Sequence, residues 1–151
     1  MSELVPTKVS VLVPAYNEEA NVRRAYEAIV ETFRGLPGYD YEIIFTDNHS
    51  TDRTFVILKE IAAKDRRVRV IRFSRNVGYQ LSLLTAYKNA TGDCSVQIDC
   101  DLQDPPHLIP QMLERWREGH QVVYGIRRTL KDGRVTRWLR RAFYRAINAM
   151  S

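Results

Sequence analysis

The chain has 151 residues, of which 44% are hydrophobic and 27% charged, a size and composition typical of one soluble globular domain. No stretch approaches the roughly 20 apolar residues of a membrane-spanning helix, and the N-terminus lacks the basic and apolar regions of a secretory signal peptide. The net charge of +5 is uneven, because residues 127–151 hold eight Lys or Arg and one acidic residue, whereas residues 1–126 hold 15 basic and 17 acidic ones. We therefore treat 1–126 as the folded domain and 127–151 as a separate basic segment.

Strands and helices are predicted to alternate along the chain. Runs of β-branched and apolar residues, the first ended by Pro14, predict strands at 9–13, 41–46, 68–73, 95–98 and 121–124. Amphipathic stretches between the strands predict helices at 21–33, about 51–64, about 79–92 and 106–118. Ser50 or Thr51 is expected to cap the second helix, and Gly92 and Gly119 to close the last two. This order predicts an α/β fold with an open, doubly wound, mostly parallel sheet and helices on both faces.

Polar side chains follow every predicted strand, at 16–19, 47–48, 74–76, 99–104 and 127–128. Because ligands bind beyond the carboxyl ends of the strands in such sheets, these five segments are expected to share one functional rim. The chain contains neither G-x-G-x-x-G nor G-x-x-x-x-G-K-[ST], which argues against the usual dinucleotide and P-loop sites. Its three histidines and two cysteines lack metal-ligand spacing, so a zinc site is not expected and both cysteines are predicted to be buried free thiols.

Two carboxylates, Asp99 and Asp101, stand two residues apart where an apolar strand ends. In extended backbone such residues point the same way, so the pair is expected to face one site. Hard oxygen donors with open coordination positions suit Mg²⁺ or Mn²⁺ that carries a substrate diphosphate. The pair is therefore compatible with chemistry on a sugar nucleotide, but Asp-rich loops with proline are also common turns and helix caps, and the pair taken alone favours that simpler interpretation.

Four segments in order resemble the GT-A glycosyltransferases of family 2, namely VPAYNEE at 13–19, Asp47 with STD at 50–52, RNVG at 75–78 and DCDLQDPP at 99–106. The closest likeness is to the polyprenyl-phosphate, dolichyl-phosphate-mannose-synthase-like group, and it extends over residues 8–148. It implies transfer of a sugar from a nucleoside-diphosphate sugar to an undecaprenyl or dolichyl phosphate, with inversion. An acceptor phosphate is already an anionic nucleophile, so no general base is required, and stabilising the leaving diphosphate becomes the main task.

The resemblance also implies roles for individual residues. The nucleotide-sugar pocket is expected to contain Pro14, Tyr16, Asn17, Glu18, Asp47, Asp99 and Asp101. The cofactor, Mg²⁺ or Mn²⁺, is expected on Asp101, with Asp99 and Gln103 assisting. Asp99, Asp101 and Arg127 form the expected catalytic set, with Arg127 near the acceptor phosphate.

The chain departs from the family pattern at two places. Where the family usually has a second aspartate and a glycine, this chain has Asn48 and His49, so a charge is lost and a residue that tolerates positive φ is replaced. After the RNVG segment the usual lysine and glutamate are replaced by Tyr79 and Gln80. The first departure bears on base selectivity and on catalytic competence.

In residues 127–151 apolar side chains recur at helical spacing and arginines fill the positions between them. The segment is predicted to be a basic amphipathic helix that either packs on the domain or lies in the headgroup layer of an anionic membrane. We favour the membrane surface, because a lipid acceptor requires that proximity. Nucleic acid is not expected as a partner, since the aromatic residues share the apolar stripe instead of alternating with the basic ones.

Members of the family usually continue through more of the catalytic domain and then transmembrane helices. The chain is therefore expected to be an N-terminal portion, incomplete at its acceptor site, of a protein anchored at the cytoplasmic face of a membrane. Two other functions stay open, a glycosyltransferase with a hydroxyl acceptor and a non-catalytic nucleotide-binding or membrane-tethering domain. The sugar and the base are not predicted. The oligomeric state is not predicted either, and a homo-oligomer stays open.

Overall fold

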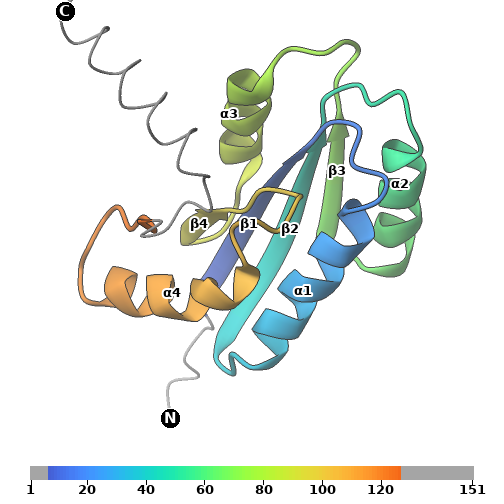
Figure 1. The fold of residues 1–151 in the computed structure, drawn as a ribbon. Helices are drawn as coiled ribbons and strands as arrows, with labels where there is room; N and C mark the ends of the chain where they lie inside the picture. Colours follow the sequence, from blue (N-terminus) through green and yellow to red (C-terminus); the bar gives the residue numbers. More distant parts are fainter. Residues whose placement is uncertain (1–6, 127–151) are drawn as a thin grey trace, which may run out of the picture. The chain divides into compact units, whose positions relative to one another are not determined.

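A computed structural model describes residues 7–126 of the chain (Figure 1). The described residues up to 120 form one compact unit, and those from 121 on belong to a second. The elements in chain order are β1 (Thr7–Ala15), α1 (Val22–Arg34), β2 (Tyr39–Asp47), α2 (Thr54–Lys64), β3 (Val68–Arg72), α3 (Tyr79–Asn89), β4 (Cys94–Gln97), the 3₁₀ turn η1 (Pro106–Leu108) and α4 (Ile109–Arg117). The predicted alternation of strand and helix is therefore confirmed.

The four strands form one parallel sheet in the order β3-β2-β1-β4. The register pairs Ala15 with Asp47, and Asp47 with Arg72, so the last residues of β1, β2 and β3 lie side by side. β4 ends beside Leu12, where its Gln97 pairs. The segments that leave the strands consequently begin along one edge of the sheet, as the doubly wound arrangement requires.

The two faces of the sheet are covered differently (Figure 1). On one face, apolar side chains of all four strands pack with α1, α2 and α4 into the main core, where side chains such as Phe45, Ile29, Leu58 and Leu113 are buried. On the other face, α3 covers a small apolar cluster of Leu12, Ile44 and Ala86. Alternating side chains of a strand face opposite sides, which explains why odd-numbered residues of β1 enter the main core and Leu12 does not.

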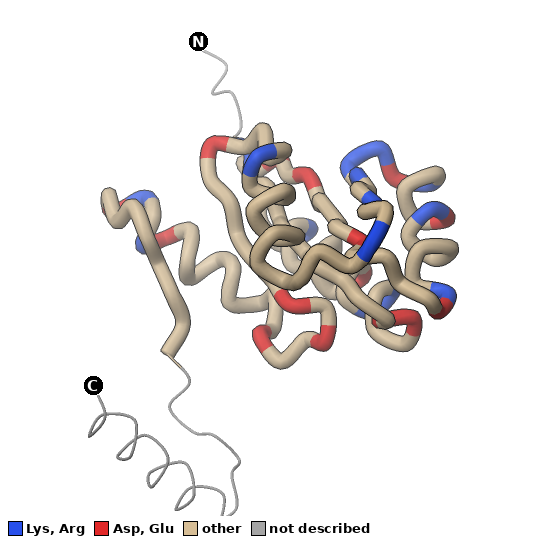
Figure 2. Tube along the Cα trace, turned by 90° about the horizontal axis from the view of Figure 1, so that it is seen from above, with Lys and Arg blue, Asp and Glu red and all other residues tan. Residues whose placement is uncertain are grey.

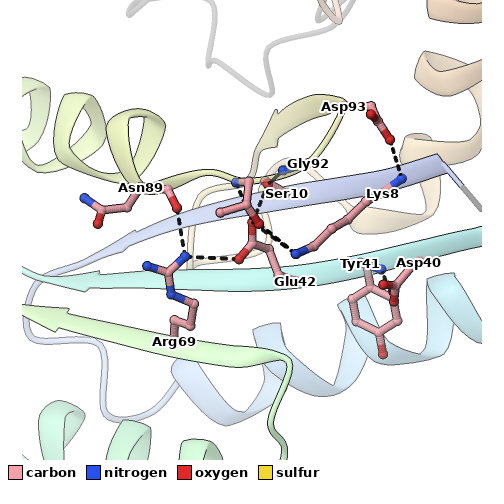
Figure 3. A network of polar contacts seen from close by, with 10 residues as sticks. Lys8, Ser10, Asp40, Tyr41, Glu42, Arg69, Asn89, Gly92 and Asp93 are labelled. Carbon is pink, nitrogen blue, oxygen red and sulfur yellow. Dashed lines mark hydrogen bonds and ion pairs between the residues drawn. The ribbon is translucent and has the colours of Figure 1, made fainter.

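A buried carboxylate occupies the second face beside α3 (Figure 3). Glu42 in β2 is only 4% exposed, and its Oε1 accepts hydrogen bonds from the Ser10 hydroxyl at 2.7 Å and from Thr91 N and Oγ1 at 2.7 and 2.8 Å. Lys8 Nζ and Arg69 Nη1 lie 3.9 and 3.3 Å from its carboxylate oxygens. Burial alone would raise the pKa of Glu42, but the bonds from Ser10 and Thr91 hold that pKa at about 2.

The first strand does not end at Pro14, as the sequence suggested. Pro14 is buried inside β1 and pairs in register with Thr46. Leu12 O accepts a hydrogen bond from Ile98 N, so even-numbered residues of β1 direct their backbone groups toward β4. Because the ladder with β4 stops at Leu12, the N–H that Pro14 lacks has no strand opposite it, and the proline is tolerated.

The predicted fifth strand at 121–124 is wrong, because residues 121–126 form no strand. Val122, Tyr124 and Ile126 are 75 to 81% exposed, so nothing described covers the alternating apolar residues that favoured a strand. Alternation gives a stable strand only where a neighbouring strand accepts its backbone groups. The basic segment 127–151 and the domain boundary after residue 126 lie outside the described residues and stay predictions.

Candidate functional site

Each of the four segments that follow the strands contains one residue in the left-handed region. Asn17 (φ 55°), His49 (φ 63°) and Leu102 (φ 61°) follow β1, β2 and β4, and Gly78 (φ 84°) follows β3. Asn17, His49 and Leu102 are the non-glycine residues with positive φ among the described residues, and this conformation costs a non-glycine residue on the order of 1 kcal/mol or more. Backbone strain is thus concentrated at the edge where the strand exits meet.

The segments after β1 and β2 are fastened to each other. Asn17 N donates to Ser50 Oγ at 3.0 Å, and Thr51 N donates to Asn17 Oδ1 at 2.9 Å. Ser50 and Thr51 were predicted to cap the second helix, but α2 begins only at Thr54, whose N–H donates to Asp52 Oδ1. The hydroxyl and amide groups that a helix start would use are instead used to join the two segments.

Glu18 and Glu19 extend this junction. Glu18 N donates to Thr54 Oγ1 at 2.7 Å, and its carboxylate accepts the Asn21 side-chain amide at 2.7 Å. Glu19 Oε2 accepts Arg53 N at 2.9 Å. The predicted pocket residues Asn17 and Glu18 therefore use their hydrogen-bonding groups to fix the two loops to each other. Tyr16 beside them is 46% exposed at the rim. Pro14 is buried within its strand.

Asp47, a predicted nucleotide contact, is fully buried at the end of β2. Its Oδ1 accepts Ser50 N at 3.1 Å, while its Oδ2 lies 3.2 Å from Arg72 Nε but has no hydrogen bond. The Arg72 guanidinium stacks 4.2 Å from the centre of the Phe55 ring and donates to Ser50 O. Sequence reasoning missed Arg72, since only the register of β2 with β3 brings it beside Asp47.

The two residues that depart from the family pattern after β2 have defined contacts. Asn48 is 5% exposed, donates to Asn76 Oδ1 at 2.9 Å, and accepts Val77 N at 2.8 Å. The His49 Nδ1 lies 3.2 Å from Phe73 O. Asn48 therefore connects the exit of β2 to the loop after β3, a role for which a side chain with both a donor and an acceptor is required.

The acidic motif after β4 forms a turn. Asp99 is partly buried, Cys100 is 3% exposed, and Asp101 is exposed. Leu102 N contacts Asp99 O at 3.3 Å, and Asp101 Oδ1 accepts Gln103 N at 3.0 Å. The extended backbone expected across Asp99 and Asp101 is therefore wrong, although both residues lie on the same short loop. Figure 2 shows the acidic positions of the domain in red along the Cα trace.

Tyr79, the second departure from the family pattern, reaches the acidic turn from the start of α3. Its hydroxyl donates to Asp99 Oδ1 at 2.9 Å and accepts a hydrogen bond from Gln97 Nε2. Burial, the hydrogen bond to Asp99 and the charge of that carboxylate raise the pKa of Tyr79 to about 12. The phenol therefore stays protonated at neutral pH and remains a donor to Asp99.

The chemistry of the turn fits a hard divalent cation. Among the described residues, no group of three or more His, Cys, Asp or Glu side chains is gathered so as to hold a metal ion alone. Burial, followed by the charges of Glu18, Asp101 and Asp99, raises the pKa of the Cys100 thiol to about 12, so this thiol is protonated at neutral pH. Carboxylate oxygens supplemented by substrate oxygens and water are the ligand set typical of Mg²⁺.

Three other predictions concern Arg127, membrane-spanning helices and the two cysteines. Arg127, expected near the acceptor phosphate, falls outside the described residues. Within residues 7–126, no helix has the length and apolar composition needed to cross a membrane. Cys94 and Cys100 are both free; Cys100 is buried, as predicted, whereas Cys94 is only partly buried.

Comparison with known proteins matches the chain to glycosyltransferases. A family model described as glycosyl transferase family 2 matches residues 10–150. The uncharacterized glycosyltransferase YkcC of Bacillus subtilis is 39% identical over 143 residues, which are 94% of the chain and 44% of the relative. The prophage bactoprenol glucosyl transferase homolog of Escherichia coli is 37% identical over 145 residues, 95% of the chain and 47% of the relative. The chain thus spans about half the length of the curated relatives it matches.

Two solved structures share the fold. The mannosyltransferase PcManGT of Pyrobaculum calidifontis, in complex with GDP-Man and Mn²⁺, superimposes with a TM-score of 0.62 at 24% identity, over 72% of the chain and 32% of that protein. S. aureus TarS 1-349, in complex with UDP-GlcNAc, gives a TM-score of 0.60 at 20% identity, over 83% of the chain and 37% of that protein. These likenesses confirm the predicted GT-A-like fold.

Proposed function

The chain belongs to glycosyl transferase family 2, and from this premise we propose that it is the donor-binding part of an enzyme that transfers a sugar from a nucleoside-diphosphate sugar to a polyprenyl phosphate. Relatives named bactoprenol glucosyl transferase, 36 to 37% identical, support the lipid-phosphate acceptor. The observation that carries the proposal is the acidic turn after β4, which lies on the same sheet edge as the exits of the other strands.

We assign the donor site to the rim residues. Tyr16 is exposed there and offers an aromatic face to the nucleotide. The Oδ2 of Asp47 is fully buried and lies 3.2 Å from Arg72 Nε without a hydrogen bond, so a donor group of the base or ribose would satisfy it once the side chains that cover it move aside. Pro14, Asn17 and Glu18 are assigned to the pocket as well, the last two by holding the loops that surround it.

The diphosphate is assigned to the acidic turn, with Mg²⁺ or Mn²⁺ on Asp101, Asp99 and Gln103. The complex of PcManGT with GDP-Man and Mn²⁺ supports a divalent cation in this fold. When bound, the cation supplies charge that stabilises the leaving diphosphate. Asp101 is exposed and Asp99 partly buried, so the first is the accessible ligand and the second the more tightly held one.

The acceptor phosphate is assigned to Arg127, and the reaction to direct displacement with inversion. The acceptor is itself anionic, so the chain needs only to position it and offset its charge. The basic segment 127–151 is proposed to hold the domain against the anionic cytoplasmic face of a membrane, close to a lipid acceptor.

Donor binding is tested by thermal unfolding of the chain with UDP-sugars and GDP-sugars, each with and without Mn²⁺. We expect one donor to raise the melting temperature in a metal-dependent way, and Asp101→Asn to remove that increase. Asp40→Asn is the matched control, since Asp40 also accepts a backbone N–H, from Tyr41, but at the start of β2 on the opposite edge of the sheet. Indifference of the wild type to every sugar nucleotide would contradict the proposal.

The acceptor is tested with the full-length protein in vesicles that contain undecaprenyl phosphate, dolichyl phosphate or the corresponding free polyprenol. Transfer to a polyprenyl phosphate and none to the polyprenol is expected. Transfer to the polyprenol alone would favour a hydroxyl acceptor and refute the acceptor assignment.

A further inference from the structure

We propose that Tyr79 is a positioning residue for the cation-binding turn, which it serves by holding Asp99 in one orientation through a hydrogen bond from its hydroxyl. The inference rests on the proposed function, because it concerns the same cation. It assigns a role to a residue at which the chain departs from the family pattern.

The hydrogen bonds at Tyr79 leave little freedom to the Asp99 carboxylate. A phenol has one proton to donate, and the Gln97 side-chain amide already donates to the phenol oxygen. The proton of Tyr79 is therefore directed to Asp99 Oδ1, which lies 2.9 Å away. With Oδ1 engaged in this way, Oδ2 of Asp99 remains as the oxygen for a cation.

A neutral donor suits this task better than a charged one. A lysine beside Asp99 would hold the carboxylate but would also neutralise it, and so compete with the divalent cation for its charge. The tyrosine hydroxyl fixes the side chain and leaves the charge in place. Hydrogen bonds to ligating carboxylates are the common way in which proteins set the geometry of a metal site.

The loop that precedes Tyr79 is fastened to the exit of β2. Gly78 takes a φ of 84°, and its N–H donates to Asn76 Oδ1 at 2.9 Å. Asn76 Oδ1 also accepts the Asn48 side-chain amide at 2.9 Å. A continuous series of contacts thus joins the exit of β2, through Asn48, Asn76 and the start of α3, to the acidic turn after β4.

The test measures Mn²⁺ binding directly, from the electron paramagnetic resonance signal of the unbound ion, in the presence of UDP and, separately, of GDP. Tyr79→Phe is expected to weaken Mn²⁺ binding about tenfold, since one hydrogen bond to a charged group is lost. Gln97→Met is expected to weaken it by roughly two- to threefold, because the hydroxyl is then free to turn away. Tyr87→Phe is the matched control, because Tyr87 is a tyrosine of the same helix with nearly the same exposure, 45% against 48% for Tyr79, and it should leave Mn²⁺ affinity unchanged.

Two further measurements separate positioning from loss of structure. Binding of UDP and GDP without metal should be unchanged in Tyr79→Phe, and its circular dichroism should match that of the wild type. If Tyr79→Phe binds Mn²⁺ as tightly as the wild type, while Asp101→Asn does not, the positioning role is refuted and the proposed function stands. If the wild type binds no Mn²⁺ with either nucleotide, both are refuted. Equal losses of Mn²⁺ and of metal-free nucleotide binding would also refute the positioning role.

Discussion

Replacing Glu42 by glutamine is expected to destabilise the fold by about 3 kcal/mol, which is the largest effect we expect from a single neutralised carboxylate in the described residues. The carboxylate is 4% exposed and accepts three hydrogen bonds on one oxygen, while Arg69 lies 3.3 Å from the other. Glutamine keeps the shape and one acceptor, but it turns an NH₂ group toward the Arg69 guanidinium. The change therefore removes the charge and sets two donors against each other.

The magnitude follows from the pKa of Glu42, which falls from 4.5 to about 2 in the folded chain. A shift of that size corresponds to about 3 kcal/mol of extra interaction with the charged form. Hydrogen bonds to charged groups exceed neutral ones by about 1 kcal/mol each, and the three bonds to Oε1 lead to a similar figure. The lowered pKa means that this stabilisation is complete above pH 4.5 and is lost as the pH falls through about 2.

Urea unfolding followed by circular dichroism provides the measurement. At pH 7 the midpoint of Glu42→Gln should be lower than that of the wild type with an unchanged slope, and the difference should shrink as the pH approaches 2. Glu31→Gln is the matched control, because Glu31 pairs with Arg34 on the exposed surface of α1 and should cost less than about 0.5 kcal/mol. A loss at Glu42 no larger than that of the control, or one independent of pH, would show that the network does not stabilise the charge.

Three further predictions concern single positions. Gly92→Ala should destabilise by about 2 kcal/mol or more in thermal unfolding, because a Cβ there would lie 2.7 Å from a backbone oxygen of β1, whereas at Gly35, the control, the nearest such contact is 3.5 Å. The Arg67 side chain beside Asp65 holds the pKa of that carboxyl at about 2, so Asp65→Asn should lower stability at pH 7 by about 2 kcal/mol, a loss that should shrink below pH 3.8 and vanish as the pH falls through about 2. Asn48→Asp, which restores the family residue, should cost about 1 to 3 kcal/mol by urea unfolding, since Asp cannot donate to Asn76 Oδ1; an unchanged midpoint would contradict this.

The sequence alone determined the alternating order of elements as far as α4, the parallel sheet and the acidic segment 99–104 as a candidate site. These features depend on local periodicity and on short motifs, which a single chain displays directly. Helix and strand ends were less accurate, because Ser50 and Thr51 have the same chemistry whether they cap a helix or join two loops. Gly92 was expected to end a helix, yet α3 stops at Asn89 and the glycine instead allows close approach to β1.

Only the tertiary structure decided which distant residues meet. The register of β2 with β3 places Arg72 beside Asp47, and the start of α3 brings Tyr79 to Asp99. The burial of Glu42 likewise depends on how β1, β2 and the segment before β4 come together. Residue type and spacing describe one segment at a time, whereas pairing between strands and the packing of a helix on a sheet are contacts between segments, and those set the geometry of the site.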